Sequence, residues 1–168
     1  MSRYGEIDII AMHPEDQNTI ELEYPNLPNE VEPVLDQLRN LIKTNKVSCV
    51  VFESTQGDGG GVSMHPEFFV ELVKLSLDEK IPLVCDEVQS GFGRSGKYFD
   101  VEYLLEHWRN SSYVANQGYP ETPPMIIAVA KSLTNGAAPG SAVIFPKEYA
   151  ILGRAQGLNT YSAHPLTL

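Results

Sequence analysis

The stretch Ile81 to Phe99, IPLVCDEVQSGFGRSGKYF, constrains the fold more than any other part of the chain. Its apolar run ends in two carboxylates, Asp86 and Glu87, and turns at once into a glycine-rich loop that carries Arg94 and Lys97. An apolar run of this kind is typical of a strand that is buried on both faces in a parallel sheet. In α/β proteins, ligands bind outside the carboxyl ends of such strands. The stretch therefore predicts an α/β fold with a ligand site where this strand ends.

The sequence before this loop predicts a strand, a helix and a second strand in succession. The run Val47 to Phe52, VSCVVF, is apolar and rich in β-branched residues, as in a buried strand. Pro66 to Lys80 has a broad apolar face at helical spacing, and it leads into the strand Ile81 to Cys85. Two parallel strands joined by a right-handed helical crossover end at the same edge of their sheet. We therefore expect Glu53 and Asp86 to lie at one edge.

The rest of the chain continues this mixed pattern. The segments from Met12 to Val31 and from Asn110 to Pro124 are rich in proline and polar residues, which predicts loops. The other elements expected are strands at Ile7 to Met12, Met125 to Ala130 and Gly140 to Phe145, and helices from Val31 to about Asn45, over Val101 to Trp108 and from Lys147 to Leu152.

Composition and charge exclude several classes of protein. The chain of 168 residues has 42% hydrophobic and 20% charged residues, which is ordinary for a globular domain. Its net charge of -10 and its scattered lysines and arginines argue against nucleic-acid binding, which requires a clustered positive surface. No apolar run approaches the roughly 18 residues of a membrane span. We therefore expect a cytoplasmic protein with no nucleic-acid or membrane partner.

The cysteines and histidines do not indicate a disulfide or a metal site. Cys49 and Cys85 both lie inside apolar runs, which is typical of small buried thiols in a reducing compartment. The four histidines are far apart and lack the spacing of metal ligands. No bound metal is expected.

Four motifs resemble those of the class III, or ω-amino acid, aminotransferases, which are pyridoxal phosphate enzymes of fold type I. The first is DEVQ at 86–89 followed by GFGRSGK at 91–97, where the family usually has threonine in place of the serine. The others are ESTQGDGG at 53–60, similar to the family's EPVQGEGG, then AKSLTNG at 130–136, and NTYSAHPL at 159–166. The resemblance extends from Val47 to Leu168.

The resemblance implies that Lys131 and Asp86 are catalytic. Pyridoxal phosphate requires a lysine that forms a Schiff base, which Lys131 would supply, and an acid that keeps its pyridine nitrogen protonated, which Asp86 would supply. We expect Lys131 to lie among apolar walls, because desolvation favours the neutral, nucleophilic amine. Without the surrounding motif, a single lysine after a strand is usually a surface charge.

The resemblance also assigns residues that hold the cofactor and the substrate. It implies that Val88 packs on the cofactor ring, that Gln89 hydrogen-bonds the ring hydroxyl, and that Thr160 reaches the cofactor phosphate of the neighbouring subunit. Glu53 matches a glutamate that faces the active site and pairs with a substrate-handling arginine. The alternative for Glu53 is a strand-terminal acid that caps a turn. Glu87 alternates away from the cofactor, so a structural role is expected for it.

Two features of the motif region have further interpretations. Arg94 and Lys97 fit a substrate-carboxylate or phosphate site, but we favour a structural role in the glycine-rich loop. Asp86 and Lys131 are 45 positions apart, which is more than the family usually shows. This spacing predicts an insertion between Phe99 and Met125.

The resemblance covers part of an enzyme. Residues 1–168 are expected to form a partial pyridoxal phosphate-binding large domain, with a mostly parallel sheet flanked by helices, and without the family's N-terminal part and C-terminal small domain. The implied reaction moves an amino group from an ω-amino donor, such as 4-aminobutyrate, ornithine or acetylornithine, to a 2-oxo acid in a homodimer. The alternative is a catalytically incompetent fragment or an interaction module that retains the sheet.

Overall fold

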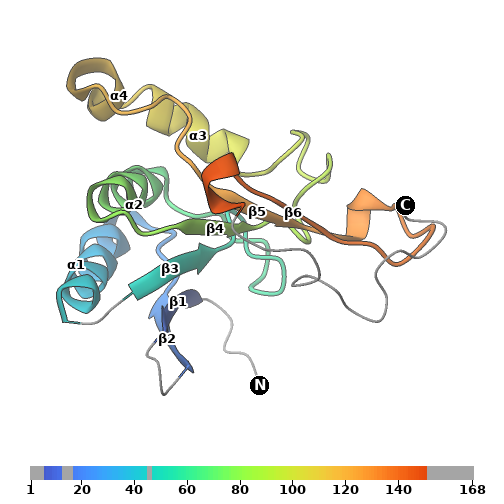
Figure 1. The fold of residues 1–168 in the computed structure, drawn as a ribbon, viewed down its shortest axis with the longest axis horizontal. Helices are drawn as coiled ribbons and strands as arrows, with labels where there is room; N and C mark the ends of the chain where they lie inside the picture. Colours follow the sequence, from blue (N-terminus) through green and yellow to red (C-terminus); the bar gives the residue numbers. More distant parts are fainter. Residues whose placement is uncertain (1–5, 13–16, 45–46, 151–168) are drawn as a thin grey trace.

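The computed structural model describes residues 6–12, 17–44 and 47–150, which form a six-stranded sheet with helices packed against it (Figure 1). The strands, in the spatial order β2-β1-β3-β4-β5-β6, are β1 (Glu6–Met12), β2 (Gln17–Glu23), β3 (Val47–Phe52), β4 (Leu83–Asp86), β5 (Ile126–Val129) and β6 (Ala142–Ile144). The helices are α1 (Pro28–Thr44), α2 (Pro66–Glu79), α3 (Glu102–Arg109) and α4 (Ser112–Gln117), with short 3-10 helices η1 (Lys131–Leu133) and η2 (Lys147–Tyr149).

The centre of the sheet is parallel. β4 pairs in parallel with β3 on one side and with β5 on the other, while β1 is antiparallel to β2 and β3, and β6 is antiparallel to β5. Strands β2, β3, β4 and β5 therefore all point the same way. The predicted α/β class, with a mostly parallel sheet flanked by helices, is confirmed.

The register of the central strands brings their carboxyl ends together. Phe52 of β3 is paired with Cys85 of β4, and Asp86 of β4 is paired with Ala128 of β5. Glu53 directly follows Phe52, so it emerges beside Asp86. The expectation that Glu53 and Asp86 share one edge of the sheet is confirmed.

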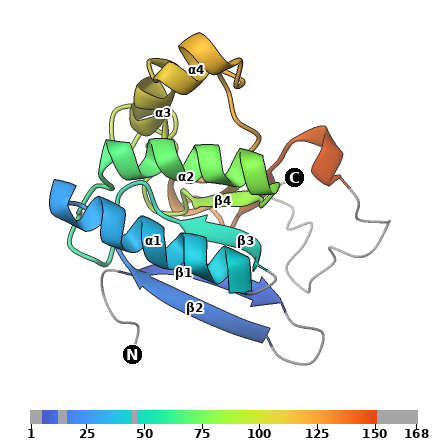
Figure 2. The same cartoon turned by 90° about the vertical axis from the view of Figure 1, so that its left-hand side faces the viewer.

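The core lies between the sheet and helices α1 and α2, which both cover the same face of the sheet (Figure 2). Side chains alternate between the two faces of a strand, and the side chains of β3 and β4 that point toward these helices are buried. The ring of Phe52 on β3 lies 5.9 Å from that of Phe69 on α2. Burying each such side chain stabilises the fold by about 1.5–3 kcal/mol. The buried residues of this layer include Val50, Phe52, Leu83 and Cys85 from the sheet and Leu35, Leu38, Phe69 and Leu72 from the helices.

Two segments that we expected to be loops form regular elements. β2 occupies part of the segment before α1 and pairs with β1 over its whole length. The signal was present, because Leu22 and Tyr24 are buried while Glu21 and Glu23 are exposed, which is the alternation of a strand with one face in water. The second such element is α4, and its helix is fixed by aromatic contacts to α3 that no local pattern predicts.

Helix α1 begins earlier than predicted, at Pro28 rather than Val31. A proline at the first helical position loses nothing, because the backbone N–H there has no partner inside the helix. The Glu30 carboxylate then accepts hydrogen bonds from the backbone N–H groups of Asn26 and Leu27. The last residues of the predicted loop, from Pro28 onward, therefore form the start of the helix.

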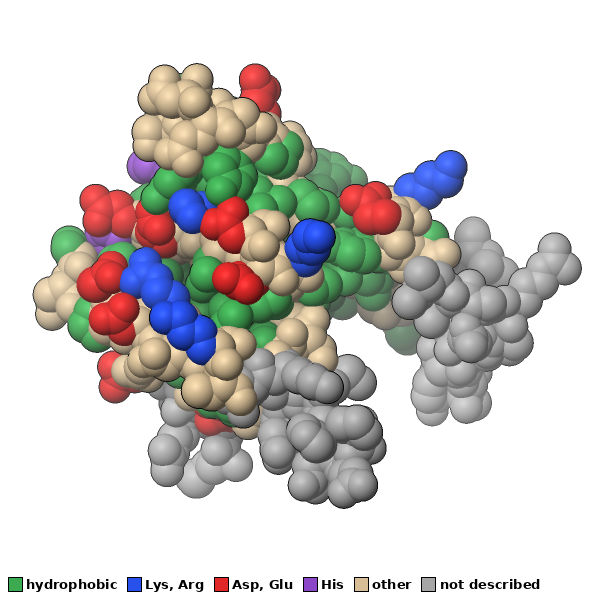
Figure 3. All heavy atoms as spheres, turned by 60° about the vertical axis from the view of Figure 1, so that its left-hand side comes forward, with side chains coloured by type: hydrophobic (Ala, Val, Ile, Leu, Met, Phe, Trp, Pro, Cys, Tyr) green, Lys and Arg blue, Asp and Glu red, His purple; other side chains and the backbone are tan. Residues whose placement is uncertain are grey.

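Charges of both signs lie together over α1 and α2 (Figure 3). Arg39 pairs with Glu32 and Asp36, and Lys74 pairs with Asp78. On this face the basic side chains thus lie among acidic ones and form no basic patch. Within the described part of the chain, none of the helices has the length and apolar content needed to cross a membrane.

Candidate active site

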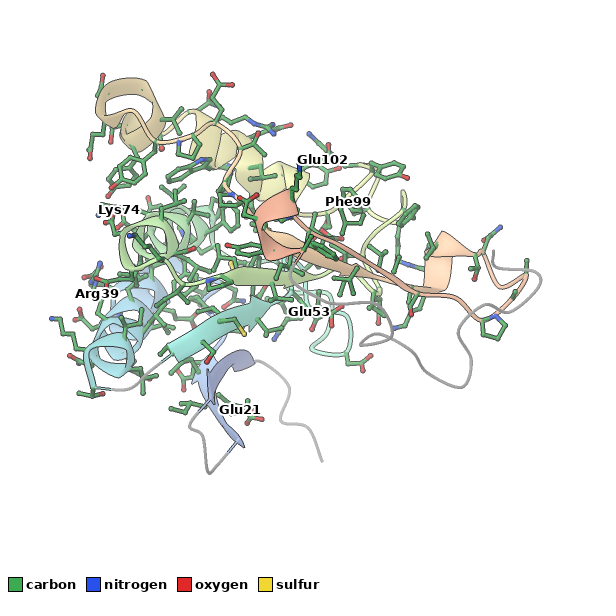
Figure 4. All side chains as sticks on the ribbon, viewed as in Figure 1. Glu21, Arg39, Glu53, Lys74, Phe99 and Glu102 are labelled. Carbon is green, nitrogen blue, oxygen red and sulfur yellow. The ribbon has the colours of Figure 1, made fainter. Side chains whose placement is uncertain are left out.

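The site predicted from sequence lies at the carboxyl edge of the parallel strands. Glu53 follows β3, Asp86 ends β4 with Gln89 in the loop after it, and Lys131 follows β5 by two positions. Figure 4 shows Glu53 beyond the end of β3, well away from Arg39 and Lys74 on helices α1 and α2. The topology thus brings together five of the six residues that the motifs indicated, since Val88 lies between Asp86 and Gln89, and their segments are up to 78 positions apart (131 minus 53).

Lys131 and Gln89 are in direct contact. The Lys131 Nζ donates a hydrogen bond of 2.8 Å to the Gln89 Oε1. Lys131 is exposed, so the expectation of apolar walls around its amine is wrong for the described residues. The physical reason is that β5 ends at Val129, and η1 carries Lys131 beyond the sheet.

The backbone at Lys131 is strained. Its φ angle is 38°, in the left-handed region that residues with a side chain rarely adopt. Such a conformation costs of order 1–3 kcal/mol and persists only where surrounding contacts hold it. The turn that presents the Lys131 amine is therefore held by its contacts rather than by its own backbone preference.

Gly57 leaves room for the Gln89 side chain beside Lys131. The Gly57 N–H donates a hydrogen bond of 3.0 Å to the Glu53 Oε2, which folds the glycine-rich loop back over the end of β3. A Cβ atom at position 57 would lie 2.4 Å from Gln89 Cδ, so only glycine leaves room for this amide. Contacts therefore run from Glu53 through Gly57 and Gln89 to Lys131. The close approach of main chain at Gly57 is therefore to the Gln89 side chain.

The Glu53 carboxyl lies in an acidic environment. Burial raises the pKa of Glu53 most, and the charges of Asp86 and Asp58 raise it further. The hydrogen bond from Gly57 and the positive charge of Lys131 oppose this rise, but the net shift is upward. The structure also satisfies the alternative interpretation of Glu53, because its carboxylate does cap the turn at Gly57.

Asp86 and Val88 form the other side of the site. The Asp86 Oδ1 accepts a hydrogen bond of 2.9 Å from the Val88 N–H, which fixes the turn directly after β4. Both residues are half-buried. An acid, an aliphatic side chain and an amide thus follow one another along this turn.

Glu87 supports this turn from behind. Its side chain is fully buried, and its carboxylate accepts hydrogen bonds from the Ser90 hydroxyl at 2.6 Å and the Val101 N–H at 2.7 Å. Burial raises the pKa of Glu87, and these hydrogen bonds oppose that shift. Glu87 therefore ties the loop to the start of α3, in agreement with the structural role predicted for it.

The two cations of the glycine-rich loop contact protein groups. Lys97 forms an ion pair with Glu106 of α3, and Arg94 donates a hydrogen bond of 3.1 Å to the Ser132 hydroxyl. These contacts favour the structural interpretation over a substrate or phosphate site. Thr160, predicted to reach the phosphate of a neighbouring subunit, lies outside the described residues.

The family model of the class-III aminotransferases matches residues 7–168. The chain belongs to the class III aminotransferase family. The mitochondrial acetylornithine aminotransferase of Debaryomyces hansenii is 33% identical over 139 residues, covering 83% of this chain and 26% of that protein. A probable 4-aminobutyrate aminotransferase of Bacillus subtilis is 33% identical over 129 residues, covering 71% of this chain and 24% of that protein.

The fold of this class III chain is also found in solved structures. An ornithine aminotransferase of Plasmodium yoelii superposes with a TM-score of 0.63 at 25% sequence identity, over 79% of this chain and 31% of that one. The chain thus spans only about a quarter to a third of the length of these relatives.

The edge described above fits the cofactor of this family. Class III aminotransferases depend on pyridoxal phosphate. An exposed amine at Lys131, a carboxylate at Asp86 on the adjacent strand and an amide at Gln89 match the groups that this cofactor requires. The residues present therefore suit the aldehyde, the ring nitrogen and the ring hydroxyl of the cofactor.

Proposed function

We propose that the protein carrying this chain is a pyridoxal phosphate-dependent aminotransferase, which moves an amino group from an ω-amino donor to a 2-oxo acid. The observation that carries the proposal is the contact between Lys131 Nζ and Gln89 Oε1 at the strand edge shared with Asp86 and Glu53. A lysine used only as a surface charge has no need of a strained turn and a matched amide. Residues 1–168 would then form part of a larger cofactor-binding domain.

The bound cofactor supplies an electron sink that stabilises the carbanion formed when the donor loses a proton. In this proposal Lys131 would hold the cofactor aldehyde through its amine, and the same amine would move the proton at the reacting carbon. The Asp86 carboxylate would keep the pyridine nitrogen protonated, because a negative charge favours the cationic form.

The remaining residues orient the cofactor and substrate. Val88 would pack against the cofactor ring, and Gln89 would hydrogen-bond the ring hydroxyl. Glu53 would face the substrate, and the electrostatic action of Lys131 on the Glu53 carboxyl supports its place at the same site. By the resemblance to the family, Thr160 would reach the cofactor phosphate of a neighbouring subunit in a homodimer.

The names of the relatives support the class of donor. The relatives are named for acetylornithine, 4-aminobutyrate and ornithine, which all carry an amino group at the end of a chain. We propose a donor of this type, a 2-oxo acid acceptor and a cytoplasmic location, which the free thiols Cys49 and Cys85 favour.

The experiment adds pyridoxal phosphate to the purified chain, records the visible spectrum, reduces the sample with borohydride and maps the labelled peptide. Label on Lys131, lost in Lys131→Ala but kept in the control Lys147→Ala, would support the proposal. Lys147 is a suitable control because it is exposed on η2, apart from the strand edge. Label spread over surface lysines without a new absorbance band would leave the family membership standing and favour the alternative, a non-catalytic module that retains the sheet.

A further inference from the structure

We infer that Arg94 is a positioning residue for Lys131, acting through the hydroxyl of Ser132. This inference rests on the proposed function, because it concerns how the lysine amine is presented to the cofactor. Arg94 lies in the glycine-rich loop, 38 positions before Ser132, and its guanidinium donates a hydrogen bond of 3.1 Å to the Ser132 Oγ. Ser132 is the residue directly after Lys131, so the bond joins the loop to the turn that carries the amine.

The loop that carries Arg94 is held in place by contacts within the loop and with α3. The Phe92 N–H donates a hydrogen bond of 2.8 Å to the Tyr98 carbonyl, which closes the loop at its two ends. The Tyr103 hydroxyl on α3 donates a bond of 3.0 Å to the Ser95 carbonyl. Lys97 adds its ion pair with Glu106 and lies over the Tyr103 ring at 4.9 Å. Arg94 therefore extends from a loop that is held on both sides.

Three aromatic rings also hold this loop in place. The ring of Phe92 lies 4.9 Å from that of Tyr98, and the ring of Phe99 lies 4.9 Å from Tyr98 and 5.9 Å from Phe92. Such pairs add about 0.5–1.5 kcal/mol each beyond the area that they bury. The three rings lock the segment on both sides of Arg94 to one another.

The turn that carries Lys131 depends on outside contacts. Its φ of 38° is unfavourable for a residue with a side chain, and η1 has only three residues and none of them is buried. Within the described residues, the side-chain hydrogen bonds that reach this turn from distant parts of the chain come from Gln89 and Arg94. The bond to Gln89 uses the Lys131 amine itself, so it is lost when that amine binds the cofactor.

Arg94 is therefore the contact that remains when the amine is engaged. It holds the backbone next to Lys131 without touching the amine, which is what a residue that positions the lysine must do. A guanidinium suits this task, because it stays charged at all physiological pH values and directs several donors in a rigid plane.

The test compares Arg94→Met, Ser132→Ala and the double variant with the control Lys97→Met, which loosens the same loop without touching Ser132. Hydrogen exchange of the cofactor-free chain reports the turn at 131–135 directly. The release rate of bound pyridoxal phosphate and the pH dependence of its visible band report how the amine is held. Both side chains are accessible, so these variants are expected to fold.

We expect each single variant to speed both exchange at 131–135 and cofactor release by about 3- to 10-fold, the effect of losing one solvent-exposed hydrogen bond. The double variant should be no worse than either single one, and Ser132→Thr, which keeps the hydroxyl, should behave as the unchanged chain. Lys97→Met should speed exchange at 131–135 less than either single variant does.

Three results would overturn the inference. Exchange at 131–135 that is unchanged in Arg94→Met, effects that add fully in the double variant, or an equal effect of Lys97→Met would each show that Arg94 does not act through Ser132. Borohydride label elsewhere than on Lys131 in the unchanged chain would overturn the proposed function and, with it, the role of Arg94. Normal labelling of Lys131 with unchanged exchange would overturn the Arg94 inference alone.

Discussion

The strand edge at Lys131 and the segment between Phe99 and Met125, predicted to be an insertion from the spacing of Asp86 and Lys131, are stabilised by different kinds of contact. At the edge, single polar contacts join exposed or half-buried groups, as in the pair Lys131 and Gln89. In the insertion, Trp108 is fully buried, and its ring lies 6.2 Å from that of Tyr113 and 6.0 Å from that of Tyr119. The Trp108 indole donates a hydrogen bond of 2.9 Å to the Pro120 carbonyl, which closes the insertion on itself.

The insertion is also fastened to α2. The Tyr113 hydroxyl donates to the Glu71 carboxylate, and the Tyr119 hydroxyl donates to Asp78 at 2.6 Å. Lys74 of α2 lies over the Tyr113 ring at 5.6 Å and pairs with Asp78. The residues that stabilise the fold and the residues proposed to bind a ligand thus lie in different regions. The insertion is hydrogen-bonded to α2, whereas the strand edge carries accessible polar groups.

The largest effect, a loss of stability, is expected from Trp108→Ala. Removing a fully buried tryptophan leaves a cavity and should lower the free energy of unfolding by about 3–5 kcal/mol. Urea unfolding followed by circular dichroism measures this, since the sequence has one tryptophan and its fluorescence is lost with the change. Trp108→Phe, which keeps an aromatic ring, should lose much less. The folded fraction of Trp108→Ala should still label at Lys131, and a loss of that label would break the proposed separation.

Gly57→Ala is expected to weaken cofactor binding while leaving stability almost unchanged. The new methyl group would overlap the Gln89 amide, which is the mobile end of a side chain and can move aside at little cost in stability. Moving it takes the Gln89 amide away from the position proposed for the ring hydroxyl of the cofactor, so the dissociation constant of pyridoxal phosphate should rise about tenfold while urea unfolding changes little. In a Gln89→Ala background the same substitution should have no further effect on cofactor binding. An additional loss there would mean that Gly57 acts by another route.

A smaller effect on stability is expected from Tyr113→Phe. The variant keeps the ring against Trp108 but removes the hydroxyl that donates to Glu71, which should cost about 0.5–1.5 kcal/mol of unfolding free energy. Tyr98→Phe is the matched control, because Tyr98 is 60% exposed and its hydroxyl makes no hydrogen bond within the described residues. Equal effects of the two changes would show that the hydroxyl of Tyr113 does not fasten the insertion to α2.

The smallest effect is a change in pH dependence at the strand edge. Because burial, Asp86 and Asp58 raise the pKa of Glu53, the folded chain binds this proton more tightly than the unfolded chain. The contribution of Glu53 to the free energy of unfolding therefore falls as the pH rises above the ordinary glutamate pKa of about 4.3. Glu53→Gln should flatten this fall by less than about 1 kcal/mol, since the site is partly open to solvent.

Urea unfolding between pH 4.5 and 7 measures the flattening. Glu79→Gln, which changes an exposed glutamate at the end of α2, is the control and should leave the slope unchanged. A steeper fall with pH in Glu53→Gln would contradict the direction of the shift.

Much of the fold was predictable because its signals are local. The continuous apolar runs of β3, β4 and β5 and the amphipathic pattern of α2 each appear within a short window. β2 was missed because its polar edge residues outweighed its alternation, although Leu22 and Tyr24 carried the signal. α4 was missed because its six residues are held by Trp108 and Glu71 from other helices.

The candidate site was predictable as a set of residues, and its internal contacts were not. The motifs indicated Glu53, Asp86, Gln89 and Lys131, but Gly57 appeared only inside the ESTQGDGG motif and not as the partner of Gln89. Its role depends on the packing of two loops 32 positions apart (89 minus 57), and no pattern within either loop records that distance.

The sequence by itself determined that Glu53, Asp86 and Lys131 follow apolar strands, and the parallel direction of β3, β4 and β5 then brings the carboxyl ends of these strands to one edge. Apolar runs within short windows, joined by segments long enough for a crossover, are sufficient for that result. Only the tertiary structure decided that Lys131 is exposed, adopts a φ of 38° and meets Gln89, and that Arg94 reaches Ser132. Those outcomes depend on contacts between segments far apart in the sequence, which exist only once the loops have packed together.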